Sequence, residues 1–228
     1  MISGSLIDQI ISVALMVFAF IPAIVLHECA HGFMAYKMGD PTAKQAGRLT
    51  LNPIAHIDPF GTVILPAILI ALQFLGAGGI MFGYAKPVPY NPRYFKNVRL
   101  GEVLVGLAGP ASNILMALIG AAIAWGGNYL YLHTPVVGYY VWYFGVYFTQ
   151  INLALAFFNL IPLPPLDGSS IIAPLLSDNA LRKYYQVQQY SMFILILLIL
   201  VLPYFIHFDV ISWYINITAG NLANLLLP

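Results

Sequence analysis

Long uncharged apolar stretches alternate with short polar breaks along most of this chain. A helix of about 20 predominantly apolar residues is long enough to cross a lipid bilayer. Five stretches meet or approach that length: residues 6–36, 102–125, 139–160, 188–206 and 209–227. The pattern therefore predicts an all-α polytopic membrane protein, with about five to six transmembrane or re-entrant helices.

Two segments between the first and second of these helices have a different character. Residues 63–75 are an apolar run of 13 positions that includes Pro66, which is short for a span and favours a re-entrant or interfacial element. Residues 82–99 are rich in proline, aromatic and basic residues. We expect part of this second segment, residues 82–95, to form a small membrane-associated β-hairpin.

Composition supports the membrane assignment. The 228 residues are 61% hydrophobic and 7% charged, with a mean hydropathy of +0.84, whereas a soluble domain has about 25% charged residues. Too few polar residues are present to solvate a globular surface, so one membrane-embedded domain spanning residues 1–228 is expected. The net charge of +1 gives no indication of a nucleic-acid partner, and the single Cys29 excludes an internal disulfide.

The basic residues predict the orientation of the chain in the cell membrane. All nine fall in three clusters: Lys37, Lys44 and Arg48; Lys86, Arg93, Lys96 and Arg99; and Arg182 and Lys183. Lysine and arginine concentrate on the cytoplasmic side of membrane proteins. The three clusters share one side if residues 60–82 dip into the bilayer and return. The N-terminus is then outside and the basic loops are cytoplasmic.

Candidate catalytic and metal-binding residues occur together near the end of the first predicted helix. No charged residue occurs from Ile10 to Leu26, and the stretch HECAH then brings His27, Glu28 and His31. Histidines four residues apart share one face of a helix, and in the H-E-x-x-H pattern they bind zinc while the glutamate serves as general base. Ionisable groups at membrane depth are costly and tend to mark function. A satisfied polar cluster between helices is the plainer alternative.

A catalytic zinc site usually has three protein ligands, so a third is needed. Only Glu102 and Asp167 are carboxylates at the junction of an apolar segment and a break. Asp167 lies in IPLPPLDG, at the late end of a helix that runs in the same direction as the first, so its depth matches that of the histidines. We therefore predict Asp167 as the third ligand, and a helix N-cap is its alternative role.

Two further polar stretches have more than one interpretation. In GLAGPASN, the small Gly109 permits close helix approach, and Asn113 either makes an interhelical hydrogen bond or donates to a substrate carbonyl. In NPIAHIDP, His56 and Asp58 favour a loop cap or a lining of the active-site entrance over a second metal site, and a lining position makes His56 a candidate substrate contact.

These motifs together resemble the site-2 protease family of intramembrane zinc metalloproteases, in its compact prokaryotic branch without a PDZ domain. The resemblance rests on HECAH at 27–31, GPASN at 109–113 and NLIPLPPLDG at 159–168, and it covers about residues 10–185. It implies a three-helix catalytic core with its active site below the cytoplasmic surface. The residue roles that it implies are one zinc ion per chain held by His27, His31 and Asp167, Glu28 as catalytic base, and substrate contacts by Asn113 and Asn159.

The expected function is an endopeptidase that hydrolyses peptide bonds in or near transmembrane segments of membrane-protein substrates. Such substrates must be unwound locally, and the expected hairpin would offer them a strand edge. A metal transporter is one alternative, but transporters usually show internal repeats with broken helices, and none is visible. A catalytically silent binding module is another alternative, disfavoured because all four core residues are present.

Overall fold

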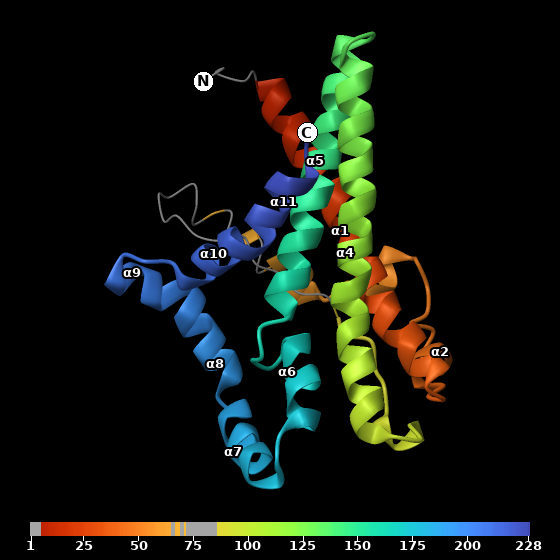
Figure 1. Cartoon of the computed structure of the whole chain (residues 1–228), viewed down its shortest axis with the longest axis vertical. Helices are drawn as coiled ribbons and strands as arrows, with labels where there is room; N and C mark the ends of the chain where they lie inside the picture. The colour runs from red at the N-terminus through yellow and green to blue at the C-terminus, as the bar shows by residue number, and fades with distance from the viewer. Residues whose placement is uncertain (1–5, 65–66, 69–70, 72–85) are drawn as a thin grey trace.

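Three long helices form the frame of the protein, α1 (Leu6–Lys37), α4 (Val98–Tyr131) and α5 (Pro135–Asn159). The computed structural model describes residues 6–64, 67–68, 71 and 86–228. Helices α4 and α5 are antiparallel neighbours, and α1 packs against both (Figure 1). Among the described residues, these three helices are the ones long and apolar enough to cross a membrane singly.

Close packing of α4 on α5 depends on glycine. A Cβ added at Gly127 of α4 would meet the backbone of Trp142, and one at Gly145 of α5 would meet the backbone of Ala124. Small residues at such contacts let helix backbones approach closely. In lipid, the resulting van der Waals packing stabilises helix association in place of the hydrophobic effect that stabilises soluble cores.

Shorter elements complete the structure. The α-helices are α2 (Thr42–Gln45), α6 (Asp167–Ile172), α7 (Asp178–Gln188), α8 (Ser191–Ile196), α9 (Leu202–Ile206), α10 (Val210–Ile215) and α11 (Asn221–Leu226). The 3-10 helices are η1 (Pro53–His56), η3 (Pro92–Tyr94) and η4 (Ala173–Leu175), and the π-helical turns are η2 (Pro59–Ile64), η5 (Leu197–Val201) and η6 (Asn216–Gly220). Residues 191–206 and 210–226 are thus each helical without interruption.

The predicted hairpin is wrong. In the part of the chain that the structure describes there is no strand, and residues 86–95 are irregular apart from η3; residues 82–85 lie outside the described part. Pro87, Pro89 and Pro92 have no N–H to donate to a strand ladder. The N–H of Lys86 bonds to the carbonyl oxygen of His56, and those of Val88 and Asn91 bond to the side chains of Glu28 and Asp40.

The described residues contain fewer clear membrane spans than the five to six transmembrane or re-entrant helices expected for the whole chain. Three described helices qualify as spans alone, and a fourth only if Asp178–Gln188 and Ser191–Ile206, which meet at an angle of 66°, count as one broken span. Residues 210–226 are helical but reach only about 25 Å at 1.5 Å per residue. They lie against α4 and α5 through a cluster of Ala117, Leu153, Ala219 and Ala223. The re-entrant prediction for residues 60–82 lies mostly outside the described residues. The all-helical, multi-span character agrees with the structure.

The basic clusters lie near one end of the bundle. Helix α2, the first turn of α4 and helix α7 all lie at the lower end of Figure 1, opposite the turn that joins α4 to α5. Each of the three carries or adjoins one cluster of lysine and arginine residues. The fold therefore provides the shared basic end that the charge pattern requires.

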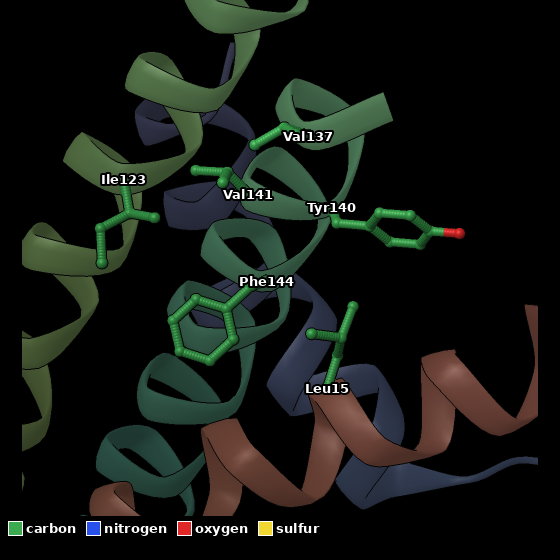
Figure 2. A pocket seen from close by; sticks show the side chains of 6 residues that line it. All are labelled: Leu15, Ile123, Val137, Tyr140, Val141 and Phe144. Atoms are coloured by element: carbon green, nitrogen blue, oxygen red, sulfur yellow. The ribbon is translucent and has the colours of Figure 1, made fainter. Parts of the chain in front are cut away.

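An apolar groove of about 510 Å³ opens between α1, α4 and α5. Figure 2 shows its lining side chains, which are Leu15, Ile123, Val137, Tyr140, Val141 and Phe144. Leu15 precedes His27 by 12 residues on α1, about 18 Å along a helix. None of the residues lining the groove is a candidate catalytic or metal-binding residue.

Candidate active site

Two histidines of α1 and one aspartate of α6 converge on a single point. The Nε2 atoms of His27 and His31 are 3.1 Å apart. Asp167 places Oδ2 3.1 Å from Nε2 of His27 and 3.3 Å from Nε2 of His31. The three side chains are only 9%, 12% and 19% exposed. The spacing of four along α1 thus presents both imidazoles to one carboxylate.

The break after α5 positions Asp167. The chain turns through residues 160–166 and begins α6 at Asp167, where α6 packs against α4. A Cβ added at Gly168 would meet the carbonyl oxygens of Leu160 and Ile161, so this turn closes tightly on itself. The N-cap residue of α6 is Leu166, and Asp167 lies inside the helix. Its carboxylate is therefore directed to the histidines, and the alternative role as an N-cap does not describe it.

Hydrogen bonds fix the tautomer of both histidines. Nδ1 of His27 lies 2.6 Å from Oδ1 of Asn113, and Nδ1 of His31 lies 2.7 Å from the carbonyl oxygen of Val105. A carbonyl oxygen only accepts, so both Nδ1 atoms carry the proton. Both Nε2 atoms then present a lone pair to the space that they share with Asp167. Outer partners of this kind orient the histidine ligands of metal sites.

The residues present fit a divalent metal ion. Two Nε2 lone pairs and a carboxylate oxygen face one another, and Oδ2 of Asp167 is buried without a hydrogen-bond partner. Buried acceptors without a donor are costly. A cation bound by all three, whose ligand atoms lie within 4.8 Å of one another, removes that cost. Two imidazoles and a carboxylate are a donor set of catalytic zinc sites.

Glu28 lies beside this centre and is held by a segment from elsewhere in the chain. Its Oε2 accepts a hydrogen bond of 3.0 Å from the backbone N–H of Val88. Residues 86–91, called here the 86–91 segment, are anchored on both sides of that contact. Arg48 donates to the carbonyl oxygens of Lys86 and Pro87, and Asp40 accepts from the N–H of Asn91 at 2.6 Å. The backbone of the 86–91 segment therefore fixes one oxygen of the predicted base.

The other predicted site residues differ in whether they contact the metal-binding cluster. Asn113 is fully buried between α1, α4 and α5, and it contacts His27, which is the first of the two roles considered for it. Asn159 ends α5 and donates to the carbonyl oxygen of Leu155. His56 is 2% exposed, and its Nε2 lies 2.9 Å from the carbonyl oxygen of Thr50. Substrate contact by these three residues stays a prediction.

Sequence reasoning missed several residues that build the site. The carbonyl of Val105 carries no signal in the sequence, because any residue supplies one. Asn152 is a fully buried amide in an apolar helix and bonds to Asn113, so its polarity at membrane depth was a usable signal. Arg48 was interpreted only as a topological charge, although it is 8% exposed and anchors the 86–91 segment.

Gly109 provides the first test of this geometry. A Cβ at position 109 of α4 would overlap Nε2 of His31 and approach Cε1 of His27 more closely than real Cβ atoms do. We expect Gly109→Ala to displace both imidazoles and to lower zinc affinity at least about tenfold. Zinc content of the purified protein and chelator competition measure this. Gly126→Ala in the same helix is the matched control, since a Cβ there meets nothing within 4 Å. Equal zinc affinity in the two variants would contradict the geometry.

A membrane-helix bundle with a His–His–Asp cluster beside a glutamate has the residues that a membrane metalloprotease needs. Residues 14–202 match the model of Peptidase family M50, and the chain belongs to this family, which confirms the predicted membership in the site-2 proteases. It is 42% identical to the "Putative zinc metalloprotease YwhC" of Bacillus subtilis (strain 168), over 82% of this chain and 80% of the relative.

More distant relatives agree. The chain is 28% identical to the "Putative zinc metalloprotease Rip2" of Mycolicibacterium smegmatis, over 89% of this chain and 73% of that protein. It is 30% identical to Rip2 of Mycobacterium tuberculosis (strain H37Rv), over 78% of this chain and 63% of the relative. No solved structure shows a significant match to the chain.

Proposed function

We propose that this protein is a zinc-dependent endopeptidase that cleaves peptide bonds in or near transmembrane segments of other membrane proteins. The observation that carries the proposal is the convergence of two imidazole nitrogens from a candidate membrane span and one carboxylate oxygen from α6 on a single point. His27 and His31 lie 10 and six residues before the end of α1 at Lys37, about 15 and 9 Å along the helix. A peptide bond reaching this centre has entered the membrane region.

The residues have distinct parts in the proposed reaction. His27, His31 and Asp167 would hold zinc, which would polarise a carbonyl and lower the pKa of water toward about 7. Glu28 accepts the proton of the attacking water at its carboxylate and delivers it to the leaving amine. The N–H of Val88 keeps one Glu28 oxygen in place, so the carboxylate is oriented before the substrate arrives.

The proposed orientation places the active site near the cytoplasmic face of the cell membrane. The basic ends of α2, α4 and α7 lie together, and the end of α1 that carries the metal ligands is close to them (Figure 1). Because basic loops remain in the cytoplasm, that end is the cytoplasmic one. Water needed for hydrolysis then enters from the cytoplasm over a short distance.

The test is cleavage of a single-span protein reconstituted with the purified zinc-loaded enzyme in liposomes. Mass spectrometry of the products locates the cut, which is expected in or next to the span. Chelation should stop the reaction, and added zinc should restore it. Zinc flux measured in the same liposomes should equal that of protein-free vesicles. Zinc transport without any cleavage would instead identify a transporter.

A further inference from the structure

A chain of hydrogen bonds crosses the apolar interior and joins all three long helices. It starts on α5 at Asn152, continues through Asn113 on α4, and ends at the metal-ligating His27 on α1. The two asparagines are fully buried and His27 is almost fully buried. Nothing in the catalytic proposal requires Asn152, because this residue contacts neither the metal ligands nor Glu28.

The direction of each hydrogen bond follows from groups that can only accept. The carbonyl oxygen of Phe148 accepts from Nδ2 of Asn152 at 2.8 Å, so Oδ1 of Asn152 must be the atom that faces α4. That oxygen accepts from Nδ2 of Asn113, also at 2.8 Å. The same Nδ2 donates to the carbonyl oxygen of Ala23 at 3.2 Å.

The orientation of Asn113 in turn decides the state of His27. With both Nδ2 hydrogens engaged, Oδ1 of Asn113 is left to face Nδ1 of His27 at 2.6 Å. His27 then carries its proton on Nδ1 and directs the lone pair of Nε2 toward Asp167 and His31. A reversed Asn113 amide would present N–H groups to Nδ1, and His27 would lose the tautomer that a metal ligand needs.

We propose that Asn152 is a positioning residue of the metal centre, acting through Asn113 to hold His27 in its metal-binding tautomer and ring orientation. The inference rests on the zinc site of the proposed function. A purely structural role for Asn152, as an ordinary bond between α4 and α5, is the competing explanation. Zinc affinity and ligand geometry separate the two, because a structural bond alters helix association without altering the metal.

The chain offers a matched control for that competing role. Thr149 lies one turn before Asn152 on α5 and is also 0% exposed, and its single hydroxyl hydrogen is shared between the carbonyl oxygens of Gly145 at 2.8 Å and Ala117 of α4 at 3.3 Å. Thr149 thus makes a buried polar contact between α4 and α5 that does not include Asn113 or His27. Thr149→Val removes this contact and leaves the chain of asparagines intact.

The principal variant is Asn152→Thr. The threonine hydroxyl is expected to donate to the carbonyl oxygen of Phe148, just as the hydroxyl of Thr149 donates to that of Gly145. The substitution therefore leaves no buried polar group of α5 without a hydrogen-bond partner. The shorter side chain withdraws the acceptor from Asn113. Asn152→Asp is the rescue variant, since a neutral buried carboxyl group donates to Phe148 and accepts from Asn113 over the same length.

The experiment measures zinc affinity by chelator competition and the visible spectrum of the cobalt-substituted protein in detergent. Asn152→Thr should bind zinc about tenfold more weakly and show an altered cobalt spectrum. Asn152→Asp and Thr149→Val should both remain within about twofold of the wild type. If Asn152→Thr matches Thr149→Val in affinity and spectrum, the positioning role is refuted while the zinc site stands. If the wild type binds no zinc, the proposed function itself fails.

Discussion

Glu28→Gln is expected to keep its zinc and to lose about 100- to 10,000-fold in kcat for a transmembrane substrate. The amide has nearly the same shape as the carboxylate, and its oxygen still accepts the hydrogen bond from Val88. It does not accept a proton from water, however, so the base is removed while the site remains assembled. Zinc content and single-turnover cleavage of the reconstituted protein measure the two effects separately.

The zinc content of the Glu28→Gln variant is the control for this experiment. One zinc per chain, bound with wild-type affinity, shows that the His27, His31 and Asp167 centre is undisturbed. Cleavage at an undiminished rate in that variant would remove Glu28 from the mechanism. Loss of zinc along with activity would mean that Glu28 supports the metal site instead of acting as its base.

Asp167→Asn is expected to lower zinc affinity about 1,000-fold and to abolish cleavage at ordinary zinc concentrations. One of the three protein ligands loses its charge in this variant. A loss of about 4 kcal/mol from a zinc-binding free energy of about 10–16 kcal/mol corresponds to an affinity about 1,000-fold lower. The variant retains the size of Asp167 and the turn at residues 160–166. Chelator competition on purified protein gives the affinity directly.

Asp178→Asn is the matched control for Asp167→Asn. Asp178 also begins a helix near the basic end, but its side chain is 84% exposed and its nearest cation is Arg99 at 3.7 Å. An exposed pair of this kind contributes little, so zinc affinity and activity should equal those of the wild type. If Asp167→Asn behaved in the same way, the third ligand would have to be sought elsewhere.

The apolar runs and short motifs of the sequence predicted the three-helix frame and the three side chains that meet at the candidate metal centre. The apolar runs at 6–36, 102–125 and 139–160 correspond to α1, α4 and α5, because a span must satisfy its backbone internally and can only be a helix. The spacing of His27 and His31 placed both rings on one face. The carboxylate of Asp167 was identified by its depth, and it meets both rings.

Features that depend on tertiary contact were not predictable in the same way. The 86–91 segment was expected in a hairpin, but its backbone bonds to Glu28, Arg48 and Asp40, which are distant in the sequence. The hydrogen bonds at Nδ1 of His27 and Nδ1 of His31 depend on how α4 packs beside α1, because their partners Asn113 and Val105 both lie on α4. Gly109 of α4 lies against both imidazoles, and Asn152 of α5 orients Asn113; only the small size of Gly109 was recognised from the sequence.

X-ray absorption at the zinc edge of the purified wild-type protein tests the central claim most directly. The account predicts one zinc per chain with two imidazole nitrogens and carboxylate oxygen at about 2.0–2.2 Å. Cys29, whose Sγ bonds to the carbonyl of Thr50 at 3.0 Å, should contribute no sulfur ligand. A zinc–sulfur distance of about 2.3 Å, or a spectrum with a single imidazole, would contradict the centre formed by His27, His31 and Asp167.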